Sequence, residues 1–123
     1  MGRKDDTGPA LVQVAPQGTV RQALNLMSTY NVSQLPVLEG GDCVGAVSEQ
    51  GLMARALEDQ GTLDRPVREL MDAPFPVVDG EWPVARLTAL LSRDTPAALV
   101  RHEGRITGIV TRYDLLHQLA GIR

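Results

Sequence analysis

The sequence predicts a mixed α/β fold (α+β) built from two tandem β-α-β-β-α units, and two observations carry that prediction. One pattern of apolar and turn residues occurs twice along the 123 residues of the chain. Within each copy, short extended segments alternate with segments that have the i, i+3, i+4 apolar spacing of helices. A unit of about 55 residues exposes one apolar sheet face and is marginal alone. We therefore expect the two units to pack sheet to sheet about a pseudo-twofold axis.

The two copies align at a spacing of 64 residues before a one-residue gap and 63 residues after it. Val20 aligns with Val84 before the gap, and Gly45 aligns with Gly108 after it. This period is too long for a solenoid repeat and fits a duplicated subdomain. The repeat predicts three segments: a flexible leader, 1–8, a first unit, 9–65, and a second unit, 66–123.

Each copy opens with an extended segment, 11–14 or 75–78, that leads through a turn into a helix. In the first copy, Thr19 and Gln22 have the spacing of a capping box. In the second copy, Pro83 is suited to the first helical position. The apolar stripes that define the two helices are Val20, Ala23, Leu24 and Met27, and Val84, Leu87, Leu90 and Leu91.

A β-hairpin and a closing helix complete each copy. Glycine-containing turns separate Val- and Ile-rich strands, which is typical of hairpins. The predicted strands are 35–38 and 43–47 in the first copy and 97–101 and 106–110 in the second. The predicted closing helices are 52–58 and 115–120, and a polar connector, 59–66, with a short helical lead, 67–71, joins the copies.

Composition and motifs exclude several classes of function. A net charge of −3 with scattered basic residues argues against a nucleic-acid surface. Cys43 is the only cysteine, so no internal disulfide forms and a cytoplasmic protein is expected. No GxSxG, HExxH, P-loop or GxGxxG string occurs, so we expect no enzyme and no required cofactor. No apolar run approaches membrane-spanning length, so we expect no membrane span. His102 and His117 lack ligand spacing, and we predict no metal site.

The Leu-Pro-Val string at 35–37 opens the first hairpin, and Gly-Ile-Val-Thr-Arg-Tyr-Asp at 108–114 closes the second. With the duplicated β-α-β-β-α order, these strings resemble the tandem CBS domain, or Bateman module, over nearly the whole chain. Together with Asn-Val-Ser-Gln at 31–34, they are most similar to the C-terminal regulatory region of cystathionine β-synthases. The resemblance implies a regulatory module that binds an adenosyl compound, with S-adenosylmethionine favoured and AMP, ADP or ATP next.

The resemblance also implies a binding cleft between the copies. Thr111 would hold the polar tail or phosphate of the ligand, and Asp114 would hold the ribose hydroxyls. Arg101 or Arg112 would supply a cation for a phosphate. The residues implied to line the adenine pocket are Val32, Ser33, Gln34 and Leu35, with apolar walls from Ile109 and Tyr113.

The symmetry-related cleft departs from the pattern because Gly51 stands where the ribose carboxylate belongs. We expect this second site to be degenerate; its residues would be Ser48, Gly51, Thr95, Pro96, Ala97 and Ala98.

Two alternatives stay open. Thr111 and Asp114 also have the spacing of a plain helix cap, and the chain could be a ligand-free structural or dimerisation module. The resemblance further implies a homodimer, built on helices that start near Val20 and Val84 or near Leu52 and Leu115. An attached or partner enzyme of the pyridoxal-phosphate class would be the regulated target.

Overall fold

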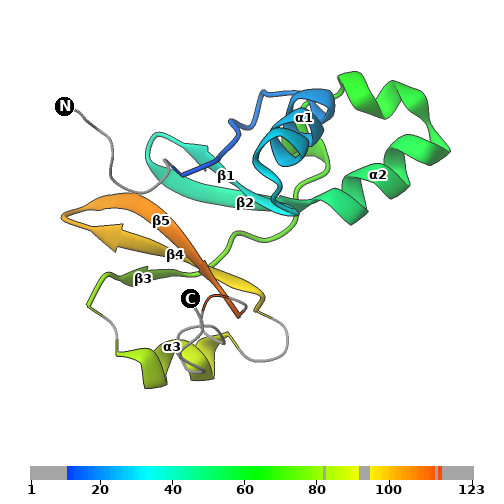
Figure 1. The fold of residues 1–123 in the computed structure, drawn as a ribbon. Helices are drawn as coiled ribbons and strands as arrows, with labels where there is room; N and C mark the ends of the chain where they lie inside the picture. The colour runs from blue at the N-terminus through cyan, green and yellow to red at the C-terminus, as the bar shows by residue number, and fades with distance from the viewer. Residues whose placement is uncertain (1–10, 82, 92–94, 113, 115–123) are drawn as a thin grey trace. The chain divides into compact units, whose positions relative to one another are not determined.

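The structure is a computed structural model, and it describes four parts of the chain: 11–81, 83–91, 95–112 and 114. Its contacts group into two compact units, coloured along the chain in Figure 1. The first unit is Val12–Phe75, and the second unit combines Pro76–Arg123 with Met1–Leu11. The domain boundaries that the repeat predicts stay a prediction.

The first unit begins with helix α1 (Val20–Tyr30), which starts at the predicted capping box. The Thr19 hydroxyl accepts the Gln22 N–H at 3.1 Å, and the Gln22 side chain accepts the Thr19 N–H at 2.9 Å. Asn31 ends the helix in the left-handed region with φ 55°, a conformation that Asn tolerates better than most residues. The predicted capping box is confirmed, and α1 lies over the β1–β2 hairpin (Figure 1).

Strands β1 (Gln34–Glu39) and β2 (Asp42–Ser48) form the predicted hairpin. The predicted strand over 11–14 is reduced to one parallel bridge between Val14 and Val37. Val14 donates to the Pro36 carbonyl at 3.2 Å and accepts from Leu38 at 3.0 Å. The next bond of a parallel ladder would need an N–H at Pro36, which proline lacks. The pairing therefore stops after one residue.

Helix α2 (Glu49–Glu58) begins three residues before the predicted start, because the Ser48 side chain caps it. The predicted polar connector contains a 3₁₀ helix, η1 (Gln60–Asp64), and the helical lead is a second one, η2 (Val67–Glu69). Thr62 in η1 is buried, and its hydroxyl donates to the Arg55 carbonyl at 3.4 Å. Thr62 therefore anchors the connector to α2, although most of the connector's residues are exposed.

The second unit contains β3 (Val77–Asp79), α3 (Val84–Leu90), β4 (Ala97–His102) and β5 (Arg105–Thr111). Strand β3 pairs in parallel with β4, and β4 pairs antiparallel with β5.

Two details of the second unit correct or limit the predictions. Pro83 is the N-cap of α3 rather than its first residue, because its ψ of 151° is extended. The predicted helix 115–120 lies outside the described residues, although Arg112 and Asp114 are already helical.

The hydrogen-bond registers confirm the internal repeat. Both hairpins carry an irregularity at the same place, between Val37 and Leu38 and between Val100 and Arg101. The bridge of Val14 to Val37 corresponds to the pairing of Val78 with Val100, so the one-residue gap in the alignment is real.

Each unit has its own aliphatic cluster. The buried residues of the first are Val14, Val20, Ala23, Met27, Leu35, Val37, Val47, Leu52 and Val67. Among the described residues of the second unit, one cluster contains Val78, Leu91 and Ala98. The mixed α+β class with two small sheets is confirmed, and sheet-to-sheet packing of the units stays a prediction.

Candidate functional site

Thr111 and Asp114 form a reciprocal cap at the junction where β5 runs into the following helical turn. The Asp114 Oδ2 atom accepts the Thr111 backbone N–H at 2.9 Å and the Thr111 hydroxyl at 3.0 Å. The Asp114 N–H donates in turn to the Thr111 hydroxyl oxygen at 3.1 Å. The capping interpretation of the Thr-x-x-Asp spacing is therefore realised in the structure.

The same geometry leaves the carboxylate able to bind a ligand. Asp114 is exposed, and none of the described residues donates to its second oxygen, Oδ1. An ionised carboxylate accepts up to about four hydrogen bonds. The two bonds from Thr111 to Oδ2 fix the orientation of the carboxylate. In that orientation Oδ1 could accept hydrogen bonds from a diol. Capping and binding are thus compatible in one residue pair.

The first unit has the same junction without the acid. The Ser48 hydroxyl accepts the Gly51 N–H at 3.1 Å. Because glycine has no side chain, it cannot accept a bond from the Ser48 N–H or hydroxyl in return. The pocket beside it has a volume of about 210 Å³ and is lined by Val47, Ser48, Gly51, Leu52, Arg55, Leu70 and Asp72.

Arg55 and Asp72 bring charge to this pocket that the sequence prediction missed. Arg55 lies one helical turn after Gly51, so the i+4 spacing on α2 could have revealed it. Asp72 reaches the pocket through an antiparallel bridge to Ala46, for which the sequence carries no signal.

The predicted adenine-lining residues of the first unit lie on the turn between α1 and β1. Val32 is half-buried against the core of the first unit, and its N–H donates to the Met27 carbonyl at 3.0 Å. Ser33 is exposed and Gln34 half-buried. The Leu35 side chain is fully buried within the core, so it can offer a ligand its main chain but not its side chain.

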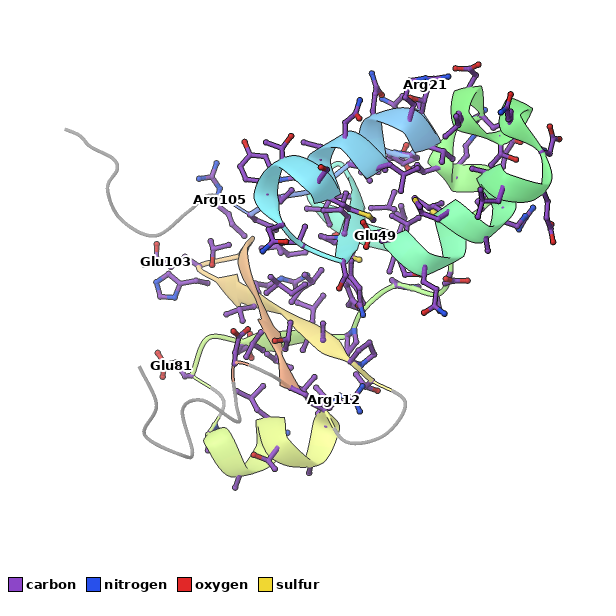
Figure 2. All side chains as sticks on the ribbon, turned by 45° about the vertical axis from the view of Figure 1, so that its right-hand side comes forward. Arg21, Glu49, Glu81, Glu103, Arg105 and Arg112 are labelled. Carbon is purple, nitrogen blue, oxygen red and sulfur yellow. The ribbon has the colours of Figure 1, made fainter. Side chains whose placement is uncertain are left out.

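This turn is tied to the helix start of its own unit. Figure 2 labels Glu49, the first residue of α2. The Ser33 carbonyl accepts the Glu49 N–H at 2.9 Å. The second unit repeats the bond, since the Pro96 carbonyl accepts the Arg112 N–H at 3.3 Å. In each unit the turn before the hairpin is therefore held in register with the cap after it.

The remaining predicted residues of the second unit are placed as follows. Ala97 and Ala98 are buried, so the degenerate site would meet their main chain at most. Thr95 is half-buried. Ile109 is half-buried on β5, opposite Leu99. Tyr113 and His117 lie outside the described residues.

A groove that sequence reasoning missed lies along α1 of the first unit. It has a volume of about 650 Å³, and its lining residues are Gln13, Val14, Ala15, Gln17, Gly18, Gln22, Asn25, Leu26 and Thr29. Every polar side chain in that set is uncharged.

The described residues include no cluster of three or more His, Cys, Asp or Glu side chains that could hold a metal ion. His102 Nε2 lies 3.7 Å from Glu103 Oε2, and both side chains are exposed. The half-buried Cys43 thiol donates to the Gly45 carbonyl at 3.2 Å. Among the helices described, none is long and apolar enough to cross a membrane.

Sequence comparison settles the family. The profile of the CBS domain matches residues 8–58 and, a second time, residues 67–121. The chain belongs to the CBS-domain family. The tandem CBS pair that the repeat predicts is thereby confirmed.

Relatives of this CBS pair occur in larger proteins and as separate modules. Inosine-5'-monophosphate dehydrogenase from Methanocaldococcus jannaschii is 31% identical over 109 residues, which are 86% of this chain and 21% of that enzyme. The chain spans 21% to 42% of the length of the curated relatives it matches.

Two solved structures share the fold. CBSX2, a CBS-pair protein from Arabidopsis thaliana solved in complex with AMP, has a TM-score of 0.74 and 26% identity, covering 90% of this chain and 88% of its own. The CBS domain of a bacterial CNNM/CorC family Mg²⁺ transporter, solved in complex with ATP, has a TM-score of 0.76 and 22% identity, covering 92% and 81%. At 22% identity, the second likeness shows the fold alone.

Proposed function

We propose that this CBS pair is a regulatory module that binds an adenine nucleotide, with Asp114 holding the ribose and Thr111 the polar tail. The observation that carries the proposal is the Thr111–Asp114 cap, which anchors Oδ2 of the carboxylate while no residue of the described part of the chain donates to Oδ1. The residues implied by the resemblance for the adenine ring, Val32–Leu35 with Ile109 and Tyr113, belong to the same proposal.

The nucleotide is AMP in our proposal, because the CBS pair CBSX2, 26% identical to this chain, was solved in complex with AMP. S-adenosylmethionine is the competing ligand, and it is supported by the similarity of Asn31–Val37 to the regulatory region of cystathionine β-synthases. Both molecules carry an adenosine whose ribose diol suits a carboxylate acceptor. They differ at the 5′ end, where AMP is anionic and S-adenosylmethionine carries a sulfonium.

Isothermal titration calorimetry with AMP, ATP and S-adenosylmethionine, each on the unaltered chain, separates these ligands. We expect heat of binding with AMP and none with adenine alone at the same concentration, since adenine lacks the ribose. S-adenosylmethionine binding without AMP binding would move the assignment to the cystathionine β-synthase type. If none of the three ligands gave heat of binding, the result would contradict the proposal and favour the hypothesis of a ligand-free module.

The second candidate, a structural dimerisation module, is favoured by one observation on α2. Met53 and Leu57, one turn apart, are 47% and 83% exposed. Unpaired apolar side chains at i, i+4 on one helix face are typical of a protein–protein contact. We propose that this face joins two copies in a homodimer, which is compatible with nucleotide binding.

Sedimentation velocity tests the dimer. The unaltered chain should sediment as a dimer at tens of micromolar (~10⁻⁵ M), the range in which a micromolar interface is filled. The variant Leu57→Glu should sediment as a monomer with unchanged melting temperature, because an 83% exposed side chain contributes little to the fold of one copy. A monomeric unaltered chain, or a Leu57→Glu dimer, would contradict the proposed face.

The regulated target is the least constrained part of the proposal. We propose an attached or partner enzyme, of the pyridoxal-phosphate class by the resemblance to cystathionine β-synthases, and no catalysis by the CBS pair itself.

A further inference from the structure

The small pocket beside the Ser48 cap is built from the first unit. Its volume is about 210 Å³, and all of its lining residues lie between Val47 and Asp72, within the span Val12–Phe75 of that unit. Pockets for drug-sized ligands are larger, usually about 300–1,000 Å³. Since one water molecule takes up about 30 Å³ of liquid, this space suits a ligand of roughly seven non-hydrogen atoms. The pocket is therefore the size of a small metabolite rather than of a whole nucleotide.

The apolar part of the lining belongs to the core of the first unit. Val47 and Leu52 are 3% and 2% exposed, and both are members of its aliphatic cluster. Leu70 is half-buried and packs against the same cluster. An aliphatic group placed beside these side chains would be removed from water, which is favourable.

Two side chains of opposite charge line the same pocket. Arg55 follows Gly51 by four residues on α2, so the two lie on one face of the helix. Asp72 comes from the segment after η2, and its main chain is fixed by two hydrogen bonds with Ala46, at 2.8 Å and 3.1 Å. Arg55 and Asp72 are both exposed, so a ligand can reach them. A ligand with charge of one sign would meet a like charge here, and the pairing favours a ligand that carries both signs.

Ser48 adds a hydrogen-bond donor to the pocket. Its hydroxyl oxygen accepts the Gly51 N–H at 3.1 Å, so the hydroxyl hydrogen takes no part in that bond and can be donated to a ligand. The pocket also lies at the N-terminal end of α2, a helix of 10 residues, where the helix dipole favours a negative group. The negative end of a ligand therefore belongs beside Ser48 and Arg55, and the positive end beside Asp72.

We propose that this pocket binds a free α-amino acid with a small aliphatic side chain, such as valine. The amino-acid carboxylate accepts hydrogen bonds from the Arg55 guanidinium and the Ser48 hydroxyl, and the ammonium donates to the Asp72 carboxylate. The aliphatic side chain packs on Leu52 and Leu70. This site is separate from the proposed nucleotide site, which depends on a carboxylate of the second unit.

The position of the pocket gives such a ligand a regulatory use. Leu70 and Asp72 lie near the end of the first unit, which closes at Phe75. An amino acid held between them and α2 would join the helix to the segment that leads into the second unit. The module would thus respond to an amino acid independently of the nucleotide.

Chemical-shift titration of the isotope-labelled full chain tests the site with three molecules of similar size. L-valine carries both charges, isovalerate lacks the amino group, and isobutylamine lacks the carboxylate. We expect L-valine at about 1–10 mM, the range of a weak small-molecule site, to shift the amide signals of Ser48, Gly51 and Asp72. The two molecules with a single charge should leave these signals in place at the same concentration, because each lacks one of the two ionic contacts.

Two variants remove one charge of the pocket each and nearly keep the shape of the side chain. Arg55→Gln and Asp72→Asn should each weaken L-valine binding by about tenfold or more, as expected when a charge-assisted hydrogen bond is lost. Arg68→Gln is the matched control, since Arg68 is an exposed arginine of η2 that does not line the pocket. Its affinity for L-valine should be that of the unaltered chain, and melting curves on all three variants report the fold.

Three outcomes would overturn the proposal. The first is an unaltered chain whose pocket amides do not respond to L-valine, and the second is an equal response to isovalerate or isobutylamine. The third is L-valine affinity that either pocket variant leaves unchanged, or that Arg68→Gln lowers as much as Arg55→Gln does. Should a pocket variant fail to fold, the comparison of the three molecules on the unaltered chain decides alone. AMP binding is measured separately, so its failure and the failure of the amino-acid site are distinguishable.

Discussion

Ser48 and Thr111 both act as helix caps in their units, yet only Thr111 has a carboxylate three positions further on. Both hydroxyls accept the N–H of the residue three positions on, Gly51 or Asp114. At Thr111 the carboxylate returns two further bonds, and at Ser48 a glycine returns none. The cap is thus shared by both units, whereas the carboxylate that we propose as ribose acceptor is present at only one of these two junctions.

The framework around the two caps did not diverge. Each unit keeps the bond from the turn before its hairpin to the first residue after it, Ser33 to Glu49 and Pro96 to Arg112. Both keep the irregularity in the hairpin register. The two units therefore share the contacts that the fold needs and differ at Gly51 and Asp114, where we propose that a nucleotide binds one unit and not the other.

The largest effect should come from Asp114. Asp114→Ala should weaken AMP binding by about ten- to a hundredfold, because a hydrogen bond to a charged acceptor contributes roughly 1.5–3 kcal/mol. Asp114→Asn keeps an oxygen that can accept the Thr111 N–H while removing the charge, so it isolates the contribution of the carboxylate. Calorimetry on both variants, with melting curves alongside, gives the measurement. Unaltered AMP affinity in Asp114→Asn would show that the charge plays no part in binding.

Gly45 should be the most sensitive glycine of the first unit. A Cβ there would come within 2.7 Å of the Met71 Cγ atom and 3.1 Å of the Asp72 carbonyl oxygen. Gly45→Ala should lower the free energy of unfolding by about 1–3 kcal/mol, as overpacking does. Urea denaturation measures it.

The double variant Gly45→Ala/Met71→Ala provides the control. It should show a positive coupling energy in a double-mutant cycle, since removal of the Met71 side chain relieves the contact. Strictly additive effects would mean that the two residues do not meet in solution.

Thr111→Val should have a smaller effect on binding than the Asp114 variants. A neutral hydroxyl bond contributes about 1 kcal/mol, so AMP affinity should fall about fivefold. Thr111→Ser keeps the hydroxyl and should restore most of the affinity. Affinity that is lost in Thr111→Ser but kept in Thr111→Val would assign the effect to the methyl group instead.

Ser48→Ala should have the smallest effect on binding. Loss of the α2 cap should lower stability by about 1 kcal/mol, with AMP affinity unchanged if the first-unit junction binds no nucleotide. Thermal unfolding measures the change in stability, and calorimetry on the same sample measures the AMP affinity. A Ser48→Ala variant that loses AMP affinity as Asp114→Ala does would remove the asymmetry between the units.

Sequence periodicity predicted most of the framework because its signals are local. The capping box at Thr19 and the two hairpins depend on residues a few positions apart, and the repeat shows the same local pattern twice. The N-terminal extended segment was overestimated, since Pro36, a residue on another strand, ends its pairing. Asp72 lies in the pocket beside Ser48 because it pairs with Ala46 in an antiparallel bridge. The two residues are far apart in the sequence, so no local pattern predicts this pairing.

Among the predicted site residues, too, those recognised from a local spacing were placed correctly, whereas the burial of side chains was not foreseen. The Thr111–Asp114 pair was predicted from a three-residue spacing, and the structure brings the two side chains together. Burial was harder to foresee: Leu35, Ala97 and Ala98 were candidates for ligand contact, and their side chains lie in the interior. An apolar residue in a strand has two faces available, and packing decides which one a ligand could reach.

The number of nucleotides bound per chain tests the asymmetry between the units most directly. AMP titrated by calorimetry into the unaltered chain and into Asp114→Asn at known active concentration gives that number. One molecule per chain, weakened in Asp114→Asn, is the result expected from a single complete Thr111–Asp114 cap. Two AMP molecules per chain, or one AMP molecule bound with unchanged affinity by Asp114→Asn, would show that the Asp114 carboxylate does not determine where AMP binds.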